Sequence, residues 1–380
     1  MSNSRSEAWV ATMEGVASGA VRRAHGDAVA KVGAGVGGGF GREEREAWED
    51  GWLAPGGTRA LGAGQRARDE APDPARTCFE RDRDRILHGT AFRRLAGKTQ
   101  VFVFPEDHQR TRLTHALEVA QVATAIAQAC RLNVALTEAI ALGHDCGHGP
   151  GGHASEDAFG PYVAGGFDHA VWGADVVLAP LNLCAETLDG VRNHSWSRPA
   201  PFTPEGEVVA WADRIAYVCH DFEDAVRAGI VTPGMLPAVV RERCGLASRG
   251  QQLGAFIDGV VSATLTTGEV VMNEGMAEAL AAFRAFNYER IYMRPASVAQ
   301  AQAVIKVLRA LVEHYADRPN SLPLLGMDPP PGFVSGSEDA VREAVTYVAG
   351  MTDRYAFSLA VTQLGWDPAR LPPGVDVAGR

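Results

Sequence analysis

The sequence has no apolar run that approaches the roughly 18 residues needed to cross a bilayer. Its N-terminal stretch, Met1 to Ala30, also lacks a continuous apolar segment, so we expect no secretory signal. Because 46% of the 380 residues are hydrophobic, disordered, collagen-like and coiled-coil classes are excluded for the bulk of the chain. We therefore expect a soluble, cytoplasmic protein with no membrane partner.

Cysteine and positive charge are also in short supply. The six cysteines form no C-x-x-C pair, which argues against a disulfide framework and a zinc knuckle, so we expect reduced thiols. A net charge of −10 argues against a protein that coats nucleic acid. Residues 75–115 differ, because they hold nine basic residues against five acidic ones. This basic segment suggests a localised anionic ligand.

Alternating strand patterns are nearly absent, and helical periodicity begins near Arg42. The pattern predicts a mostly α-helical protein with one large helical domain and a proline-rich loop over Pro319–Phe333. The predicted helices cover Arg112–Arg131, Val134–Asp145, Glu207–Gly229, Glu274–Tyr292, Val298–Asp317 and Ser337–Ala360.

Glycine is concentrated before the helical region, in Lys31–Gly41. This stretch contains a G-x-G-x-x-G pattern at Gly33, Gly35 and Gly38, but no β-branched run precedes it and the charged segment GREEREAWEDGW follows it. A flexible linker is therefore favoured over a nucleotide loop. We predict that residues 1–41 form a flexible, glycine-rich extension.

The segment HDCGHGPGGHASE places three histidines, an aspartate and a glutamate directly after a predicted helix. At a helix end, His144 and Asp145 can turn onto one ion, and His115 and Asp213 on other helices can complete the site. Two imidazoles with two carboxylates suit Mn²⁺, Fe²⁺, Co²⁺ or Mg²⁺. A single histidine is more often a satisfied core residue, but this combination favours metal-dependent hydrolysis.

The third predicted helix carries a polar stripe of Asp213, Tyr217, Asp221 and Asp224 on an otherwise apolar background. Such a stripe is usually a solvated face. It also fits the wall of a polar cavity, and the nearby histidine-aspartate segment favours that interpretation.

Several longer strings carry a resemblance to a known family. The chain resembles the bacterial deoxyguanosine-triphosphate triphosphohydrolase family of HD-domain phosphohydrolases from near Arg42, and the resemblance thins after Tyr292. It implies an all-α HD-domain fold with appended C-terminal helices, with a core over residues 42–300 and a helical region packed on it over residues 301–380. The strings are FERDRDRILHGTAFRRLAGKTQVF, RTRLTHALEVAQ, EAIALGHDCGHGPGGHASE, LNLCAETLDGVRNH and ADRIAYVCHDFEDAVRAG.

The resemblance implies hydrolysis of a deoxynucleoside triphosphate, with dGTP as the default, to a deoxynucleoside and inorganic triphosphate. A divalent metal would polarise the α-phosphate and activate a bound water. His153 would be the general acid, and Glu156 would hold its tautomer. His148 and His169 would line the same pocket, to bind phosphate or complete a proton relay. Arg112, one helical turn before the first metal ligand, would clamp the triphosphate.

The resemblance also implies a deoxyribose site formed by Gln100, Tyr217 and Asp221. An aromatic ring packed where a 2′-hydroxyl would lie rejects ribonucleotides, while Asp and Gln hydrogen-bond the 3′-hydroxyl. Without the resemblance, Gln100 reads as an ordinary surface amide.

Three basic residues, Arg93, Arg94 and Lys98, have open roles. They could hold an allosteric nucleotide or single-stranded DNA, or form surface ion pairs. The resemblance further implies a homo-oligomer, either a hexamer or a tetramer.

The sequence departs from the family in the loop before His153. Glycines stand where the family has a proline and a phenylalanine, so we expect a more mobile loop.

Two alternative functions stay open. One is another HD phosphohydrolase activity, such as a 5′-nucleotidase or phosphodiesterase, and the other is a nucleotide- or ssDNA-binding regulator with a degenerate site.

Overall fold

The chain divides into two compact units, Met1–Gly41 and Arg42–Arg380. In the first unit, helix α1 (Ser4–Thr12) is followed by an antiparallel hairpin of strands β1 (Val16–Ser18) and β2 (Val21–Arg23). Residues 34–38 of the glycine-rich stretch, including two glycines of the G-x-G-x-x-G pattern, lie outside the described residues. The computed structural model describes residues 4–33, 39–103, 105, 107–245, 248–322 and 332–372.

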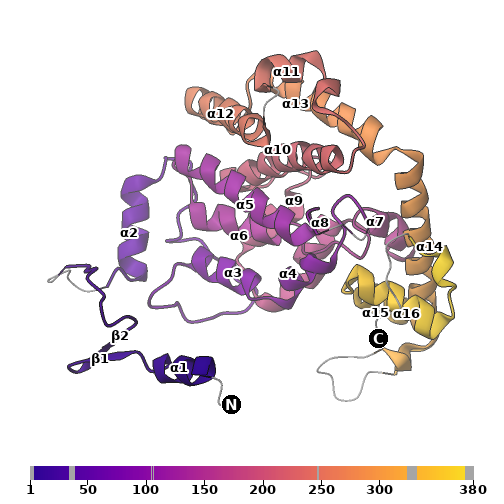
Figure 1. Cartoon of the computed structure of the whole chain (residues 1–380), viewed down its shortest axis with the longest axis horizontal. Helices are drawn as coiled ribbons and strands as arrows, with labels where there is room; N and C mark the ends of the chain where they lie inside the picture. Colours follow the sequence, from indigo (N-terminus) through magenta and orange to yellow (C-terminus); the bar gives the residue numbers. More distant parts are fainter. Residues whose placement is uncertain are drawn as a thin grey trace. The chain divides into compact units, whose positions relative to one another are not determined.

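All the regular secondary-structure elements in the described residues of the second unit are helices, and this confirms the all-α prediction (Figure 1). The strands β1 and β2 of the first unit are the only ones in the described part of the chain. The helices of the second unit are α2 (Arg42–Trp52), α3 (Cys78–Leu87), α4 (Thr90–Arg94), α5 (Arg112–Ala129), α6 (Val134–Gly143), α7 (Ala154–Phe159), α8 (His169–Trp172), α9 (Ala185–Asn193), α10 (Pro204–Arg227), α11 (Ala238–Cys244), α12 (Arg249–Thr267), α13 (Glu274–Asn287), α14 (Pro295–Asp317), α15 (Glu338–Ala349) and α16 (Asp353–Leu364).

Local capping explains where the helices that carry the site begin and end. The Thr111 hydroxyl accepts a hydrogen bond from the amide of Thr114 and starts α5 at the predicted residue. In α10, the Thr203 side chain caps the helix and Pro204 occupies its first turn, so this helix begins three residues before the predicted Glu207. It ends before Gly229, whose φ of 69° suits glycine.

Two predicted helices are interrupted. The predicted helix Ser337–Ala360 is wrong as one element, because α15 ends at Ala349 and the Thr352 hydroxyl caps a new helix by accepting from the Tyr355 amide. The predicted helix that reaches Tyr292 is α-helical only to the end of α13 and continues as a π-helical turn. Residues 323–331 of the predicted proline-rich loop lie outside the described residues.

Two separate apolar cores stabilise the second unit. The larger core includes side chains from α3, α5, α6, α9, α10, α11, α12 and α13. Phe79, Ile126 and Phe283 are fully buried in it. The smaller core joins α7 to α14, α15 and α16 around Phe159 and Phe357. Burial of a side chain of this size stabilises a fold by about 1.5–3 kcal/mol. The two cores leave a cavity between them, which holds the candidate site.

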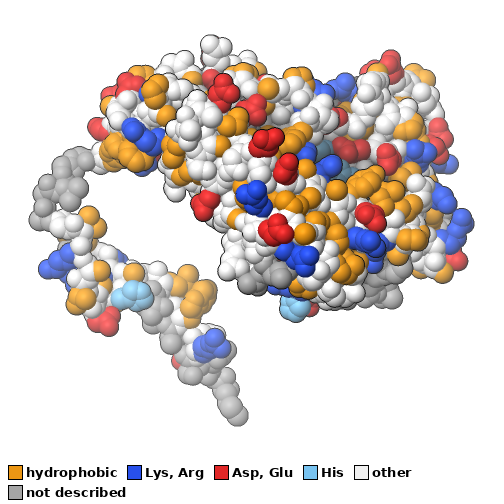
Figure 2. Space-filling model, turned by 90° about the horizontal axis from the view of Figure 1, so that it is seen from above, with side chains coloured by type: hydrophobic (Ala, Val, Ile, Leu, Met, Phe, Trp, Pro, Cys, Tyr) orange, Lys and Arg blue, Asp and Glu red, His pale blue; other side chains and the backbone are white. Residues whose placement is uncertain are grey.

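The basic segment at residues 75–115 is largely neutralised by its own neighbours. Arg76 and Arg83 pair with Asp84, while Arg81 and Arg85 pair with Glu70. On the face shown in Figure 2, Lys and Arg side chains alternate with Asp and Glu. Each of the four arginines named above therefore has a carboxylate partner. No helix in the described residues is both long enough and apolar enough to cross a membrane.

Candidate active site

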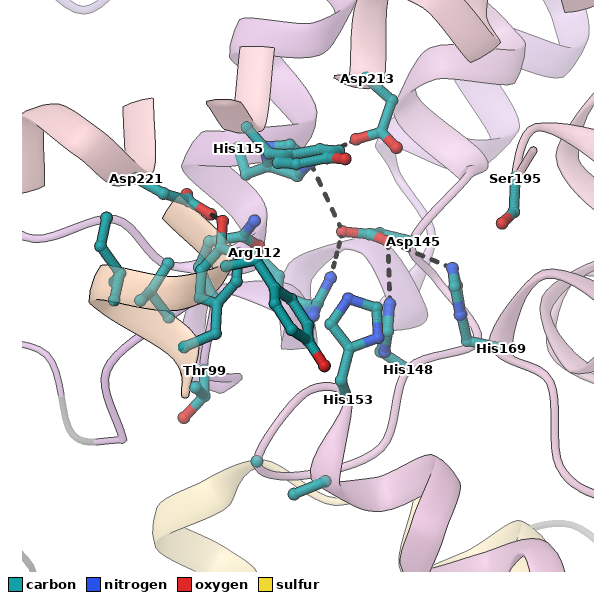
Figure 3. A pocket seen from close by; sticks show the side chains of 18 of the residues that line it. Thr99, Arg112, His115, Asp145, His148, His153, His169, Ser195, Asp213 and Asp221 are labelled. Carbon is teal, nitrogen blue, oxygen red and sulfur yellow. Dashed lines mark hydrogen bonds and ion pairs between the residues drawn. The ribbon is translucent and has the colours of Figure 1, made fainter. Parts of the chain in front are cut away.

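A cavity of about 460 Å³ lies between the two cores, within the usual range for small-molecule sites. Its walls come from α5, α10 and α14, from the loop between α6 and α7, and from the π-helical turn after α13. Figure 3 shows the side chains that converge in it. The walls thus bring together segments that are far apart in the sequence.

The four predicted metal ligands converge at one end of the cavity, where His115, Asp145 and Asp213 line the wall and His144 is buried. The Nε2 atom of His115 lies 3.0 Å from Asp213 Oδ1 and 3.9 Å from Asp145 Oδ2. The Nε2 atom of His144 lies 3.5 Å from Asp145 Oδ1 and 3.7 Å from Asp213 Oδ1. The sequence prediction therefore selected side chains that the fold places in one cluster.

This cluster has the donor atoms that a divalent cation requires. The ring of His144 is buried, and its Nδ1 donates to the carbonyl of Ala141 at 2.7 Å. This leaves the lone pair of Nε2 facing the cluster, where it has no hydrogen-bond partner. Two imidazoles and two carboxylates fit Mn²⁺, Fe²⁺, Co²⁺ or Mg²⁺. The residues present therefore fit a divalent metal.

The charges of the cluster favour cation binding. Burial alone would raise the pKa of Asp145, but Arg112 and neighbouring histidines hold it well below its ordinary value. Burial opposes ionisation of Asp213 too, yet the hydrogen bond from His115 keeps that pKa low. Both carboxylates are therefore ionised at neutral pH.

Arg112 lies at the same end of the cavity, on the first turn of α5. Its Nη1 donates to Asp145 Oδ2 at 2.7 Å, while its buried Nε and Nη2 atoms have no hydrogen-bond partner. A buried guanidinium with unused donors is a favourable anion site. The side chain is thus placed to bind a phosphate oxygen while it holds Asp145.

A second group of histidines surrounds Glu156. His153 lines the cavity with a largely exposed side chain, and its Nδ1 lies 3.0 Å from Glu156 Oε2. His169 Nδ1 donates to the other carboxylate oxygen at 2.6 Å. Burial would raise the pKa of Glu156, but these two hydrogen bonds hold it below its ordinary value. The ionised carboxylate therefore orients both rings.

His148 is buried and stacks on His169, with ring centroids 3.7 Å apart. Its Nε2 lies 3.1 Å from Asp145 Oδ1. Burial and the charge of Arg112 lower the pKa of His148 well below its ordinary value, so its ring is neutral.

The predicted sugar-binding residues line the other end of the cavity. Gln100 has a buried side-chain oxygen with no hydrogen-bond partner. Tyr217 accepts a hydrogen bond from Arg284, and Asp221 accepts one from the Tyr292 hydroxyl at 2.5 Å. Burial raises the pKa of Asp221 to about 7.

Two predictions from the sequence need correction. Asp224, the last residue of the predicted polar stripe, lies outside the cavity wall and pairs with Arg110. The surface ion-pair interpretation of Lys98 is wrong, because Lys98 is buried and its Nζ donates to the carbonyl oxygens of His148 and Ala349.

The other two basic residues whose roles were open, Arg93 and Arg94, are exposed and donate to backbone carbonyl oxygens.

The glycines before His153 are required by the backbone. Gly151 and Gly152 have φ angles of 74° and 64°, where other residues are strained. A Cβ on Gly152 would lie 2.9 Å from the Thr99 carbonyl oxygen, and the Gly151 amide donates to Asp353 at 2.8 Å. This contact fastens the loop to α16. The expected mobility of the loop stays a prediction.

Among the lining residues to which the sequence analysis assigned no role, two make hydrogen bonds that bear on the site. His194 is buried at the end of α9, and its Nδ1 donates to the Val191 carbonyl as His144 does to its own helix. The sequence does hold a signal for His194, because a histidine directly after a helix is the same pattern that marked His144 as a candidate site residue. Tyr292 gave no local signal, since only the fold brings its hydroxyl to Asp221.

Known proteins resemble this chain over most of its length. The HD domain family matches residues 112–218, and the phosphohydrolase-associated domain family matches residues 270–361. The chain is 40% identical to a deoxyguanosinetriphosphate triphosphohydrolase-like protein of Caldanaerobacter subterraneus subsp. tengcongensis, covering 83% of this chain and 93% of that protein.

Two further proteins of the same description give similar values. One from Desulfatibacillum aliphaticivorans is 37% identical, covering 83% of this chain and 96% of that protein. One from Clostridium perfringens is 40% identical, covering 76% of this chain and 87% of that protein. The chain therefore belongs to the family of deoxyguanosinetriphosphate triphosphohydrolase-like proteins, which are built on an HD phosphohydrolase domain.

Proposed function

We propose that the protein hydrolyses deoxynucleoside triphosphates, with dGTP as the default substrate, to a deoxynucleoside and inorganic triphosphate. One observation carries this proposal: a single cavity has a cation-binding cluster and a buried arginine at one end, and aromatic and carboxyl side chains at the other. The first end suits phosphates, and the second suits a sugar with its base. The related proteins are described as deoxyguanosinetriphosphate triphosphohydrolase-like, which supports the same reaction.

The phosphate end accounts for metal and substrate binding. His115, His144, Asp145 and Asp213 would hold the divalent ion, which when bound supplies a Lewis acid for the α-phosphate and acidifies water. Arg112 would bind a phosphate oxygen through its unused donors. Water attacks the α-phosphorus, and the bond from phosphorus to the 5′ oxygen breaks.

The leaving 5′ oxygen needs a proton, and His153 would give it. Its ring lines the cavity, and Nδ1 donates to the Glu156 carboxylate. In the doubly protonated ring, the proton on Nε2 would be the one given to the 5′ oxygen, which leaves a neutral ring. The triphosphate then leaves unbroken because the reaction occurs at the α-phosphorus.

The sugar end offers a basis for choosing deoxyribose. Asp221 and Gln100 have oxygen atoms that could accept the 3′-hydroxyl proton, and the rings of Tyr217 and Tyr292 narrow the space beside them. A hydroxyl at the 2′ position would meet an aromatic ring without a partner, which costs about 1–3 kcal/mol. We expect GTP to be a poor substrate.

The proposal is tested by an assay that resolves the anionic products. The purified full chain is incubated with Mn²⁺ and each of the four dNTPs or GTP. Intact triphosphate with the matching deoxynucleoside is the expected result. Orthophosphate or pyrophosphate would identify another HD chemistry, and silence with bound metal would favour a regulator. Turnover only in a dNTP mixture would identify an activating nucleotide.

A further inference from the structure

Two cysteines that are far apart in the sequence lie side by side at the starts of two helices. Cys78 is the first residue of α3, and Cys184 directly precedes α9. Their sulfur atoms lie 2.7 and 3.5 Å from one point, the position that a Cβ on Gly64 would take. The Sγ atom of Cys184 also lies 3.9 Å from the carbonyl oxygen of Cys78. The hydrogen bond to the Cys78 thiol, together with burial, raises the pKa of Cys184 well above its ordinary value.

A buried ion pair holds the backbone of both cysteines. Arg66 Nη1 lies 2.7 Å from Asp82 Oδ1. The Nη2 atom of Arg66 donates to the Cys78 carbonyl at 3.0 Å, and Asp82 accepts from the Cys184 amide at 2.7 Å. Because the two side chains of the pair bind one cysteine each, the pair fixes the start of α3 beside the start of α9.

The two thiols differ in their access to solvent. Cys184 is buried, whereas Cys78 is partly exposed. Cys78 lines a second cavity, of about 350 Å³, together with residues 60–66 of the segment before α3. The six cysteines all lie in the described residues, and Cys78 is the one among them that is not buried. A small oxidant that enters from solvent therefore meets Cys78 first.

We propose that Cys78 and Cys184 form a reversible disulfide when a peroxide reaches Cys78. The Cys78 sulfur attacks a peroxide oxygen, the O–O bond breaks, one water leaves, and Cys78 becomes a sulfenic acid. The Cys184 sulfur then attacks the Cys78 sulfur, the S–O bond breaks, and the thiol proton leaves in a second water. Two thiols are oxidised to one disulfide, and one hydrogen peroxide is reduced to two waters.

The cross-link would join two helices that pack against the same neighbour. Both α3 and α9 contact α6, the helix that ends at His144. The disulfide would also close a loop of roughly 100 residues, which restricts the unfolded chain and so stabilises the folded one. Neither cysteine lines the cavity of the candidate active site. We therefore expect a higher unfolding temperature, with turnover that changes by less than about twofold.

The test is oxidation of the reduced full chain with hydrogen peroxide. Intact mass and peptide mapping are followed by mass spectrometry, and the unfolding temperature by calorimetry. The wild type should lose two hydrogen atoms, link Cys78 to Cys184, and unfold about 5 °C higher. Dithiothreitol should reverse both changes. Cys78→Ser and Cys184→Ala should show neither change, whereas Cys130→Ala, which removes a buried cysteine outside the pair, should behave as the wild type.

Three results would overturn the proposal. The first is a wild-type chain whose mass does not change, and the second is one that gains oxygen on Cys78 without a cross-link. The third is a cross-link that persists in Cys78→Ser. Circular dichroism checks that each reduced variant is folded, and Cys78→Ser decides the test if Cys184→Ala is unfolded, because its position is partly exposed. Since the mass measurement needs no substrate, failure here is distinct from failure of the proposed reaction.

Discussion

The orientation of the His153 ring follows from the hydrogen bond that its Nδ1 makes with Glu156. Because Glu156 holds Nδ1, the opposite nitrogen is the one that faces substrate. Replacing this ring should affect proton transfer without disturbing the cation cluster, since His153 is not one of its four ligands.

We therefore expect His153→Ala to keep its metal and lose turnover by about 10²–10⁴-fold, the usual contribution of a general acid. Steady-state kinetics and metal content are measured on the same preparation. Glu156→Gln should reduce kcat less, because it leaves the ring in place. Wild-type turnover in His153→Ala would show that another group is the acid.

Asp221 should give the protein a stability that depends on pH. Burial raises its pKa to about 7 from the ordinary 3.8, so the neutral form is favoured in the folded state. The stability contributed by this group is present at low pH and is lost as the pH rises through about 7. Asp221→Asn removes the titration.

The variant should therefore gain thermal stability relative to the wild type as the pH rises, by on the order of 2 °C or more between pH 5.5 and 8.5. Both proteins are melted at a series of pH values with Mn²⁺ held constant. Parallel curves for the two proteins would show that Asp221 does not titrate in this range.

The site residues could be predicted from the sequence where the pattern is local. His144 and Asp145 are neighbours, and His115 and Asp213 lie on strongly periodic helices, so their meeting needed only helix packing. His194 and Tyr292, the hydrogen-bond partner of Asp221, were missed. Their place in the site depends on contacts that only the folded chain creates.

Helix α16 acts on the site through one buried carboxylate. Asp353 accepts hydrogen bonds from the Thr99 amide and hydroxyl, at 2.9 and 2.5 Å, and from the Gly151 amide. It thus joins the C-terminal helices to the segment before Gln100 and to the loop before His153.

Asp353→Ala should leave two backbone amides without partners and lower the free energy of unfolding by about 2–5 kcal/mol. It should also reduce turnover at temperatures where the protein is folded, because the loop is released. Urea unfolding and kinetics measure the two effects. Asp258→Ala, an exposed change on α12, is the matched control and should alter neither. A variant as stable as the wild type would contradict this role.

The helices themselves were predictable from apolar spacing and caps, whereas their interruptions were missed. Ser337–Ala360 does hold local signals for a break, because Gly350 caps the end of α15 and Thr352 caps the start of α16. Helical periodicity continues across both residues, so apolar spacing alone did not reveal the break. Burial of Asp353 beside Thr99 then places α16 where it can hold the loop.

The described residues that line the cavity run from Thr99 to Ala301, within the second unit. We expect deletion of residues 1–41 to leave kcat/KM within about twofold and the unfolding temperature within about 2 °C. Kinetics and calorimetry on the shortened and full chains check this. A large loss of turnover would show that the extension acts on catalysis or assembly.

The cavity lies between two apolar cores that share few side chains. A nucleotide that contacts both walls of the cavity links the two cores. We therefore expect bound nucleotide to stabilise the arrangement of the two cores in the folded protein. By linkage, a ligand at a hundred times its Kd adds about 2.7 kcal/mol to the free energy of unfolding. The shift in unfolding temperature should therefore rank the affinities for nucleotides that differ in their base, even for a catalytically inactive variant.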